Sequence, residues 1–593
     1  MNMKNIVLLL LAVLLLSAPL LRADDIPQAK ARAAAEVFFA KCGVETRSGS
    51  ALTLIGTDLT GEPTRSGQNA AWYVFNRQGG GFVIISGLDA AYPVLGYSLE
   101  HTFCPLEEMP SHMKEWMDLY RDQINERRTS GKPATKEELA RWDDAFTMTR
   151  VEGAPASLDL QTADWGQGTP FNRFCPLDSA GKKSIVGCVA TAISEVMYFF
   201  KQPAHGTGTL PQYTKKGVTV GPVELGEDYQ WDKMLPKYKS VSYTDEQADA
   251  AATLCYHVGV MCKMGYGSGA SSASTATGVE GLLQYMGYDK ATVRHSRSYT
   301  TTEEWRALLR GQLEEGYPVL FAGNSGSAGH AFVVDGYDDA GRFLINFGWN
   351  ASSNGYYQLD AFGSYTISQT AYLGVKPDAG GSYQPHFYLR PTTQSGVVYN
   401  GLILTGGTLA TGSTFTLRFG AVMNHGYAAA GCKINFAHTD RNGNIKSMMR
   451  SSDISISSLS DGYYTWWSSN QSLTVTKPIE RGDKIVPMYR LTSDSDQWYR
   501  FGYSQNESFT PEIMMHLRDY TSLAYDKAAR TFTVETFANT EWTLYDALDQ
   551  HVDNGSVPAS GSSFTLKCAN YPSGTYRLNL TLGTQTADIT LTF

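Results

Sequence analysis

The hydrophobic periodicity of this chain changes near Gly380 and Gly381. Before this point, segments with helical spacing alternate with strand-like runs. Beyond it, helical spacing is nearly absent, and short alternating runs lie between turn residues, as at 414–419, 473–476 and 531–534. Because apolar side chains recur every three to four residues in helices and every two in strands, the sequence predicts an α+β part followed by an all-β part.

The all-β part is expected to contain two modules. The spacing of strands and turns is typical of Ig-like β-sandwiches and places them at 384–514 and 515–593. The strand–turn–strand pattern at 572–578 is also typical of surface-sorting tails, although many sandwich domains end in this way. The last module is therefore interpreted either as an ordinary sandwich or as a sorting tail.

The α+β part begins with a small module of its own. Two segments have helical patterns and two have the pattern of paired strands: 26–42, 112–127, 71–75 and 81–86. The second helix has an apolar face formed by Met113, Trp116, Met117 and Tyr120. The charged segment 132–150 then leads to Gly153-Ala154-Pro155-Ala156-Ser157, a soft stretch that suits proteolytic processing. We expect residues 24–155 to be a propeptide and 156–380 to be a separate domain.

The first 23 residues have the layout of a secretory signal peptide. Lys4 precedes an apolar run from Ile6 to Leu16, Pro19 interrupts the end of this run, and Ala23 stands before an acidic pair. The alternative is a membrane anchor, which needs about 20 apolar residues. The run here is shorter, so we expect residues 1–23 to be removed and the protein to be secreted, either extracellular or associated with a cell surface.

Composition excludes several classes of protein. A hydrophobic fraction of 42% and a charged fraction of 18% describe a globular chain. The net charge of −9, without a Lys/Arg run, disfavours nucleic acid and anionic membrane surfaces as partners, and no later segment is apolar enough to span a bilayer. Eight cysteines are too few for a disulfide scaffold in 593 residues. Cys255 and Cys262 lack clustered His or acidic ligands, so we expect two buried structural thiols, with no metal and no other cofactor.

Cys188 stands where a helix is expected to begin. Gly187 precedes it, and an apolar stripe at helical spacing runs through residues 189–200. The positive end of a helix dipole stabilises a thiolate, which is the nucleophilic form of cysteine. On this segment alone, a small buried hydrophobic residue is an equally good interpretation.

His330 provides the partner that a nucleophilic cysteine requires. It opens a predicted strand, 331–334, after the Gly/Ser-rich loop 323–329, where substrate backbone can approach closely. Taken alone, such a histidine is more often structural. Together with Cys188 it predicts the base and nucleophile of a cysteine hydrolase, in the first place a peptidase.

Further residues complete the arrangement. Gln167 lies about 20 residues before Cys188, and its carboxamide can donate to the oxyanion of acyl transfer together with the Cys188 backbone N–H. Asn346 can accept the imidazole N–H, and an aromatic residue such as Trp349 can shield that bond from water. The alternatives are a loop role for Gln167 and core packing for Trp349.

Five ordered segments resemble motifs of the streptopain family of papain-like cysteine peptidases. They are Gln167-Gly168-Thr169-Pro170-Phe171-Asn172, Gly187-Cys188-Val189-Ala190-Thr191-Ala192, the serine-rich stretch 266–274, Gly329-His330-Ala331-Phe332-Val333-Val334-Asp335-Gly336, and Asn346-Phe347-Gly348-Trp349. The resemblance covers about 158–378. Residues 26–150 also resemble the inhibitory propeptide of the family, and the β modules resemble extensions of its longer members.

The resemblance implies a papain-like fold and specific roles. Cys188 would be the nucleophile, His330 the base and acid, and Gln167 the oxyanion donor, while Ser272 and Gly329 would line the substrate cleft. Phe347 stands where relatives commonly carry Trp. Whether Asn346, Phe347 or Trp349 orients the histidine is therefore left open.

These inferences predict a secreted cysteine endopeptidase made as a zymogen. Its partners would be protein or peptide substrates, its own propeptide as inhibitor, and a host or surface ligand for the β modules. Two alternatives remain: an amidase or acyltransferase acting on cell-wall peptides, and a surface adhesin with a residual catalytic domain.

Overall fold

The computed structural model describes residues 23–44, 52–59, 69–147, 156–324, 329–361, 369–394, 396–460, 462–465, 470–492, 497–505, 508–558, 561–583 and 585–592. The chain divides into two compact units, one formed by 1–297 with 301–383 and the other by 298–300 with 384–593. The apolar run 6–16, the stretch 153–155 and the loop residues 325–328, all used above, lie outside the described residues.

Within its described residues, the predicted propeptide contains four strands and three helices. They are α2 (Gln28–Lys41), β1 (Leu52–Thr57), β2 (Trp72–Arg77), β3 (Phe82–Ser86), β4 (Val94–Ser98), α3 (Ser111–Thr129) and α4 (Lys136–Phe146). The two predicted helices are confirmed, and so is the predicted strand pair, since β2 and β3 are antiparallel neighbours. Helix α4 was not expected in a charged segment. It forms because Thr135 and Glu138 make a capping box at its start and Trp142 is buried.

A single eleven-stranded sheet joins the predicted propeptide to the domain that follows. Its order is β1-β2-β3-β4-β14-β13-β12-β11-β15-β10, and β5 (Ser157–Asp159) pairs with β12. The later strands are β10 (Val293–Ser296), β11 (Val319–Asn324), β12 (Gly329–Asp338), β13 (Phe343–Asn346), β14 (Gly355–Tyr357) and β15 (Gln369–Leu373). The two parts meet where Tyr97 and Gly96 of β4 stand opposite Tyr356 and Tyr357 of β14. A Cβ at Gly96 would lie 2.7 Å from the Tyr357 ring, so this seam requires glycine.

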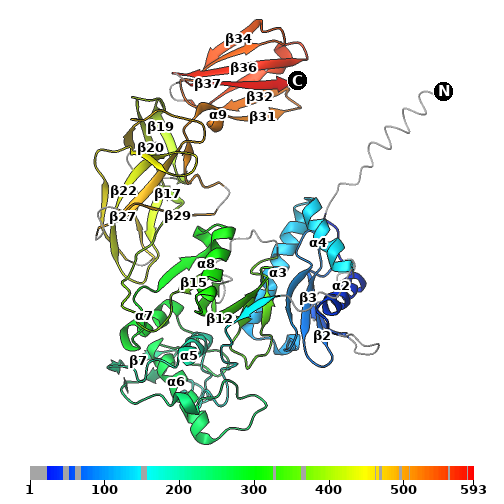
Figure 1. Ribbon diagram of the computed structural model, residues 1–593, viewed down its shortest axis with the longest axis vertical. Coiled ribbons are helices and arrows are strands. Elements are labelled where there is room, and N and C mark those ends of the chain that lie inside the picture. The colour runs from blue at the N-terminus through cyan, green and yellow to red at the C-terminus, as the bar shows by residue number, and fades with distance from the viewer. Residues whose placement is uncertain are drawn as a thin grey trace, which may run out of the picture. The chain divides into compact units, whose positions relative to one another are not determined.

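Alternation along β12 places two different layers on the two faces of the sheet (Figure 1). Phe332 and Val334 belong to a core shared with α3 and with α8 (Thr302–Glu314). Ala331 and Val333 belong to the core that contains α5 (Cys188–Phe200), α6 (Asp245–Met261) and α7 (Thr275–Tyr285). The helix that begins at Cys188 therefore packs on one face of β12, and the propeptide helix α3 packs on the other.

Short elements complete the first unit. They are the hairpin strands β6 (Thr209–Leu210), β7 (Tyr213–Lys215), β8 (Val218–Val220) and β9 (Val223–Glu224), and the 3₁₀ turns η1 (Leu106–Glu108) and η2 (Trp231–Lys233). A further 3₁₀ turn, η3 (Arg297–Tyr299), has residues in both units. As expected, Cys255 and Cys262 are buried, and both lie in the core beneath α5.

The second unit is built almost entirely of strands. The first group is β16 (Phe387–Arg390), β17 (Thr392–Gln394), β18 (Val397–Tyr399), β19 (Ile403–Gly407), β20 (Thr414–Arg418), β21 (Ala421–Asn424), β22 (Ala430–Thr439), β23 (Ile445–Met448), β24 (Ile454–Leu459), β25 (Tyr464–Thr465), β26 (Gln471–Thr474), β27 (Lys484–Leu491), β28 (Tyr499–Arg500), β29 (Gly502–Tyr503) and β30 (Ile513–Met514). The second group is α9 (Leu517–Tyr520), β31 (Ser522–Asp526), β32 (Thr531–Glu535), β33 (Glu541–Tyr545), β34 (His551–Ser556), β35 (Ser563–Lys567), η4 (Cys568–Asn570), β36 (Thr575–Leu582) and β37 (Gln585–Thr592). The predicted class, α+β followed by all-β, is confirmed.

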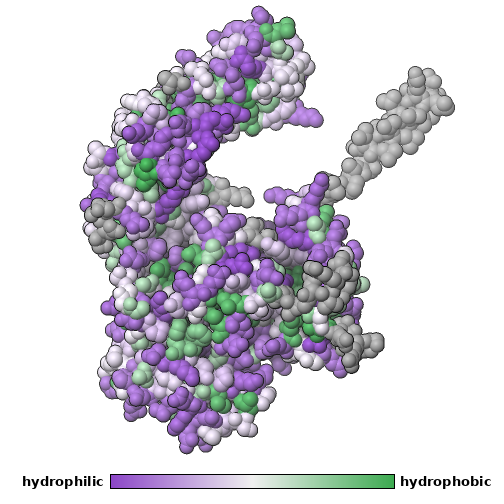
Figure 2. Space-filling view, viewed as in Figure 1, coloured by the Kyte–Doolittle hydropathy of each residue, from purple (hydrophilic) through white to green (hydrophobic). Residues whose placement is uncertain are grey.

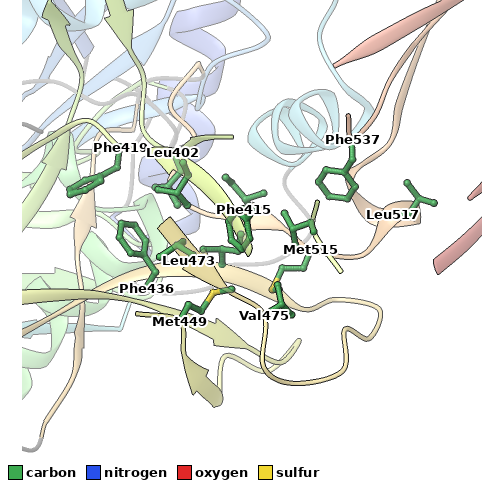
Figure 3. Packing of buried hydrophobic residues seen from close by; sticks show 14 of the residues in the cluster. Leu402, Phe415, Phe419, Phe436, Met449, Leu473, Val475, Met515, Leu517 and Phe537 are labelled. Atoms are coloured by element: carbon green, nitrogen blue, oxygen red, sulfur yellow. The ribbon is translucent and has the colours of Figure 1, made fainter. Parts of the chain in front are cut away.

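Buried side chains from both predicted β modules belong to one apolar cluster. Phe415 and Leu473 come from the first and Phe537 from the second (Figure 3). Gln585 bridges them as well, because it accepts from the Leu517 amide at 2.7 Å and donates to the Leu409 carbonyl at 3.0 Å. The division at 514/515, like the other domain boundaries, stays a prediction.

The surface carries hydrophobic residues in small patches. Figure 2 shows a face on which hydrophilic residues predominate. In the part of the chain that the structure describes, no helix is both long enough and apolar enough to cross a membrane.

Candidate active site

The local backbone explains why Cys188 begins α5. Gly187 is the residue before the helix and has φ of +91°, a conformation that L side chains rarely adopt. A Cβ at this position would lie 2.8 Å from Met264 Sδ and 3.0 Å from Ser271 Cβ. Glycine therefore allows the close approach that brings Cys188, itself half-buried, to the first turn of the helix.

The environment of Cys188 keeps its thiol protonated in the precursor. Burial raises the pKa of the Cys188 thiol above its ordinary value, and the charge of Glu115 on α3 raises it further. Hydrogen bonds from the amides of Ala331, Val189 and Cys188 act in the opposite direction. The contact with Ala331 is informative, because it places the Cys188 sulfur beside the residue that follows His330.

The imidazole of His330 lies among aromatic rings. His330 is buried on β12, opposite Gly323 of β11. Its ring centroid is 5.7 Å from that of Phe332 and 6.5 Å from that of Phe347, with interplanar angles of 29° and 21°. Trp116 of α3 contacts both phenylalanines edge-on, at 5.7 and 6.3 Å. The propeptide helix thus covers the aromatic residues that flank His330.

Helix α3 is attached to both parts of the sheet. The Trp72 indole donates to the Met117 carbonyl at 3.0 Å. The Tyr120 hydroxyl donates to the Leu95 carbonyl at 3.0 Å and also to the carbonyl of Gln358, beyond the seam. Gln123 accepts from the Ala361 amide at 2.8 Å. These bonds hold α3 in register over β12.

Asn346 is engaged in a network on β13. Its Nδ2 donates to the Ala163 carbonyl at 2.8 Å and to Thr162 Oγ1 at 3.2 Å. Its Oδ1 accepts from the Gly348 amide at 3.0 Å and from Asn354 Nδ2 at 3.1 Å. These bonds tie β13 to the segment that leads to Gln167.

Two aromatic residues follow Asn346. Trp349 packs, half-buried, against the core that contains Phe332, and the ring of Phe347 stacks beside His330. Which residue orients the imidazole in the active enzyme stays a prediction.

Gln167 lies close to the start of α5. It is buried, and its carbonyl accepts from the amide of Val186, two residues before Cys188, at 2.9 Å. This arrangement brings the predicted oxyanion donor into the neighbourhood of the nucleophile, although no contact tests its role.

The two predicted cleft residues lie in different settings. Ser272 is exposed and pairs through its backbone with Gly265. The buried serine beside Gly187 is Ser271, whose hydroxyl donates to the Ile185 carbonyl at 2.7 Å. Gly329 stands opposite Asn324 at the end of the β11–β12 hairpin. The roles of Ser272 and Gly329 in binding substrate stay predictions.

Sequence reasoning missed two buried acids. Glu195 is the one charged residue in the apolar helix α5, and Asp335 ends an apolar run in β12. Their relative exposures are 0% and 4%. A charged residue inside an apolar pattern is the signal that could have identified them.

An acidic cavity lies beside Asp335. It has a volume of about 430 Å³ and is lined by Glu100 and His101 of the predicted propeptide and by Asp159, Asp164 and Asp335 of the following domain. Among the described residues, no group of three or more His, Cys, Asp or Glu side chains is arranged to hold a metal ion.

Two family models match the chain. The model of the Peptidase C10 family matches residues 165–357, and that of the Spi protease inhibitor matches residues 23–124. Together they cover the region around Cys188 and His330 and the module that carries α3.

Individual relatives agree with these matches. The thiol protease/hemagglutinin PrtT of Porphyromonas gingivalis is 30% identical over 391 residues, which are 62% of this chain and 44% of that protein. The chain thus covers less than half the length of this relative. Streptopain of Streptococcus pyogenes is 28% identical over 361 residues, 56% of this chain and 86% of that protein. The solved structure of a prointerpain A fragment from Prevotella intermedia has 30% identity and a TM-score of 0.43, and covers 55% of this chain and 99% of that fragment.

Proposed function

Since this chain belongs to the Peptidase C10, or streptopain, family of cysteine peptidases and carries an inhibitor-type propeptide, we propose that it is a secreted endopeptidase made as a zymogen. One observation supports the proposal most directly. Cys188 begins a helix, and its sulfur lies against the Ala331 amide, next to His330. Two motifs that are far apart in the sequence thereby come together.

The proposed reaction uses these residues in the order of acyl transfer. His330 takes the proton of the Cys188 thiol, and the thiolate attacks the scissile carbonyl carbon. The resulting oxyanion accepts hydrogen bonds from the Cys188 amide and the Gln167 carboxamide. His330 gives its proton to the leaving amine. It then takes a proton from water, which hydrolyses the thioester and releases the second product.

The propeptide would restrain this reaction in two ways. Trp116 packs on Phe332 and Phe347, the two rings beside His330, and so would limit movement of the imidazole. The charge of Glu115 and the burial of the thiol raise the pKa of Cys188, so the neutral, unreactive thiol predominates. Removal of α3 would lift both restraints at once.

Secretion and substrate class belong to the same proposal. The N-terminal charge and apolar run support export, and the family membership supports protein substrates. Binding of a host or surface ligand by the β modules is a second candidate function. It is favoured because the second unit has its own continuous core and one relative is named a thiol protease/hemagglutinin.

The decisive experiment compares two cysteine variants of the full chain. Cys104 and Cys188 are the two cysteines that are only partly buried, so Cys104→Ala is a matched control for Cys188→Ala. Incubation of the wild-type precursor should produce self-cleavage near residue 150, together with labelling by a thiol-directed epoxide inhibitor. Both should vanish in Cys188→Ala and persist in Cys104→Ala.

Other outcomes would redirect the proposal. Cleavage that persists in purified Cys188→Ala would indicate an outside protease, and an inert wild type would favour the adhesin function. Profiling on protein substrates and on cell-wall peptides would separate an endopeptidase from an amidase.

A further inference from the structure

Two buried carboxyl groups stand on the two elements that carry the proposed nucleophile and base. Glu195 lies on α5, seven residues after Cys188, and Asp335 lies on β12, five residues after His330. Relative exposures of 0% and 4% leave them almost without access to water. Because α5 packs on β12, the charge of Asp335 acts on Glu195.

Each carboxyl group is half satisfied by hydrogen bonds. Glu195 Oε1 accepts from the Trp165 amide at 3.3 Å. Asp335 Oδ2 accepts from the Thr162 hydroxyl, whose oxygen in turn accepts from Asn346. Within the described residues, Glu195 Oε2 and Asp335 Oδ1 are buried without a hydrogen-bond partner. A buried acceptor without a donor is costly, and a proton held on one of these acids can provide that donor.

The electrostatics favour a retained proton. Burial is the main cause that raises the pKa of Glu195 well above its usual range, and the charge of Asp335 adds to it. Burial likewise raises the pKa of Asp335 to about 7. Burial together with like charge favours a state in which one of the two carboxyl groups keeps its proton.

We propose that Glu195 and Asp335 are positioning residues that share a proton, hold α5 against β12 and thereby set the spacing between Cys188 and His330. The segment from Thr162 to Trp165, which leads to Gln167, is bonded to both acids and so belongs to the same unit. The inference rests on the proposed function, because it concerns the alignment of the same catalytic groups.

Other titratable groups around the pair share its acidic character. Asp159 on β5 and Asp164 in the following loop face it, as do Tyr356 on β14 and Cys255 on α6. Across the cavity stand Glu100 and His101. Loss of the shared proton would therefore add negative charge to a region that already contains it.

The expected pH dependence has a definite sign. A carboxyl group whose pKa is raised by folding contributes full stability at pH values below its unfolded pKa, and this contribution is lost as pH rises through its folded pKa. For Asp335 the loss should extend up to pH about 7. For one proton, the unfolding constant should change about tenfold per pH unit across that range.

The test compares Glu195→Gln with Glu195→Ala in the full chain. Glutamine keeps the shape of the Glu195 side chain and has an N–H group that can replace the shared proton as a donor to Asp335. Alanine removes the side chain and with it the proposed interaction with Asp335. After processing, Glu195→Ala should lower kcat by about 100-fold with KM changed less than about threefold, as expected for misaligned reacting groups. Glu195→Gln should restore kcat to within about tenfold of wild type and reduce the change of kcat/KM with pH below about 7, the range in which Asp335 loses its proton.

A second readout does not depend on activity. Thermal unfolding of the precursor is measured from pH 5 to 9 in a Cys188→Ala background, which prevents self-cleavage. In this background, the protein that keeps Glu195 should lose stability as pH rises towards neutrality. The added change Glu195→Gln should make this loss of stability per pH unit smaller. The matched control is Asp289→Asn. Asp289 is equally buried but accepts from the backbone amides of Ala291 and Ala379, so its replacement should leave the slope unchanged.

The outcomes separate this inference from the proposed function. The proposal about the carboxyl pair is overturned if Glu195→Gln leaves the change of stability with pH unaltered, or if Glu195→Ala leaves kcat unaltered. In either case Cys188→Ala would still abolish hydrolysis. The wild-type protein could have no hydrolytic activity and still show the predicted change of stability with pH. In that case the inference of a shared proton stands and the catalytic proposal fails.

Discussion

Replacement of Trp116 should release the precursor from inhibition. Trp116 is 7% exposed and contacts three rings of the catalytic domain, those of Phe332, Phe347 and Tyr357, at 5.7, 6.3 and 6.1 Å. Each such aromatic pair contributes about 0.5–1.5 kcal/mol beyond the area it buries. A buried Trp→Ala change costs about 3–5 kcal/mol in total. Part of this loss falls on the propeptide itself, because Trp116 also packs on Tyr120 of its own helix.

We therefore assign about 3 kcal/mol to contacts that hold α3 over the catalytic domain. Since 1.4 kcal/mol corresponds to a tenfold change in an equilibrium constant, Trp116→Ala should raise the population of open precursor about 100-fold. The assay is the initial rate at which iodoacetamide alkylates Cys188, measured before cleavage products appear. When opening and closing are fast, this rate follows the open population.

Trp116→Phe is the graded control. The indole N–H of Trp116 is buried without a partner in the described part of the chain, so phenylalanine loses ring area but no hydrogen bond. The alkylation rate in this variant should rise by no more than about tenfold, since the aromatic contacts are largely kept. If Trp116→Ala remains folded by circular dichroism and is alkylated at the wild-type rate, the reasoning about α3 is wrong.

Three further predictions follow from individual contacts. Glu115→Gln removes a charge that raises the pKa of Cys188, so titration of the closed precursor by thiolate absorbance, with Cys188→Ala as the blank, should give a lower pKa for this thiol; an unchanged pKa would contradict this. Gly187→Ala forces a side chain into φ of +91° and should destabilise the fold by about 1–3 kcal/mol, with loss of Cys188 labelling, as followed by urea unfolding and inhibitor binding. In the β unit, burial lowers the pKa of His438. The hydrogen bonds that Asp483 accepts from Lys446 and His438 lower the pKa of Asp483, so both groups take up protons more readily when the unit is unfolded. Stability of this unit should therefore fall as pH drops below about 6.5, and calorimetry showing a gain instead would refute the assignment.

Local pattern accounts for much of the fold and for the identity of the candidate site. The start of α5 at Cys188 could be predicted because a glycine and an apolar stripe act within a few residues of one another. The same holds for β12 after the Gly/Ser-rich loop and for the amphipathic face of α3. Helix α4 was missed because its sequence is mostly charged, although its polar and apolar residues recur at helical spacing and the capping box at Thr135 signals its start.

Contacts between distant segments were decided by the tertiary structure alone. Pairing of β4 with β14 merges the propeptide and the catalytic domain into one sheet, and periodicity within a strand does not specify its neighbours. The same packing brings Phe347 beside His330 and places Trp116 against Phe347.

The sequence by itself determined where α5 begins and where β12 runs, and it predicted which residues carry the chemistry, because helix starts, strand alternation and ordered motifs are properties of short segments. Which side chains surround these residues was decided only by the tertiary structure. Glu195 and Asp335 are separated by 140 positions in the sequence and meet because α5 lies on β12. Burial and proximity to like charge arise from long-range packing, and these two quantities determine whether each acid keeps its proton.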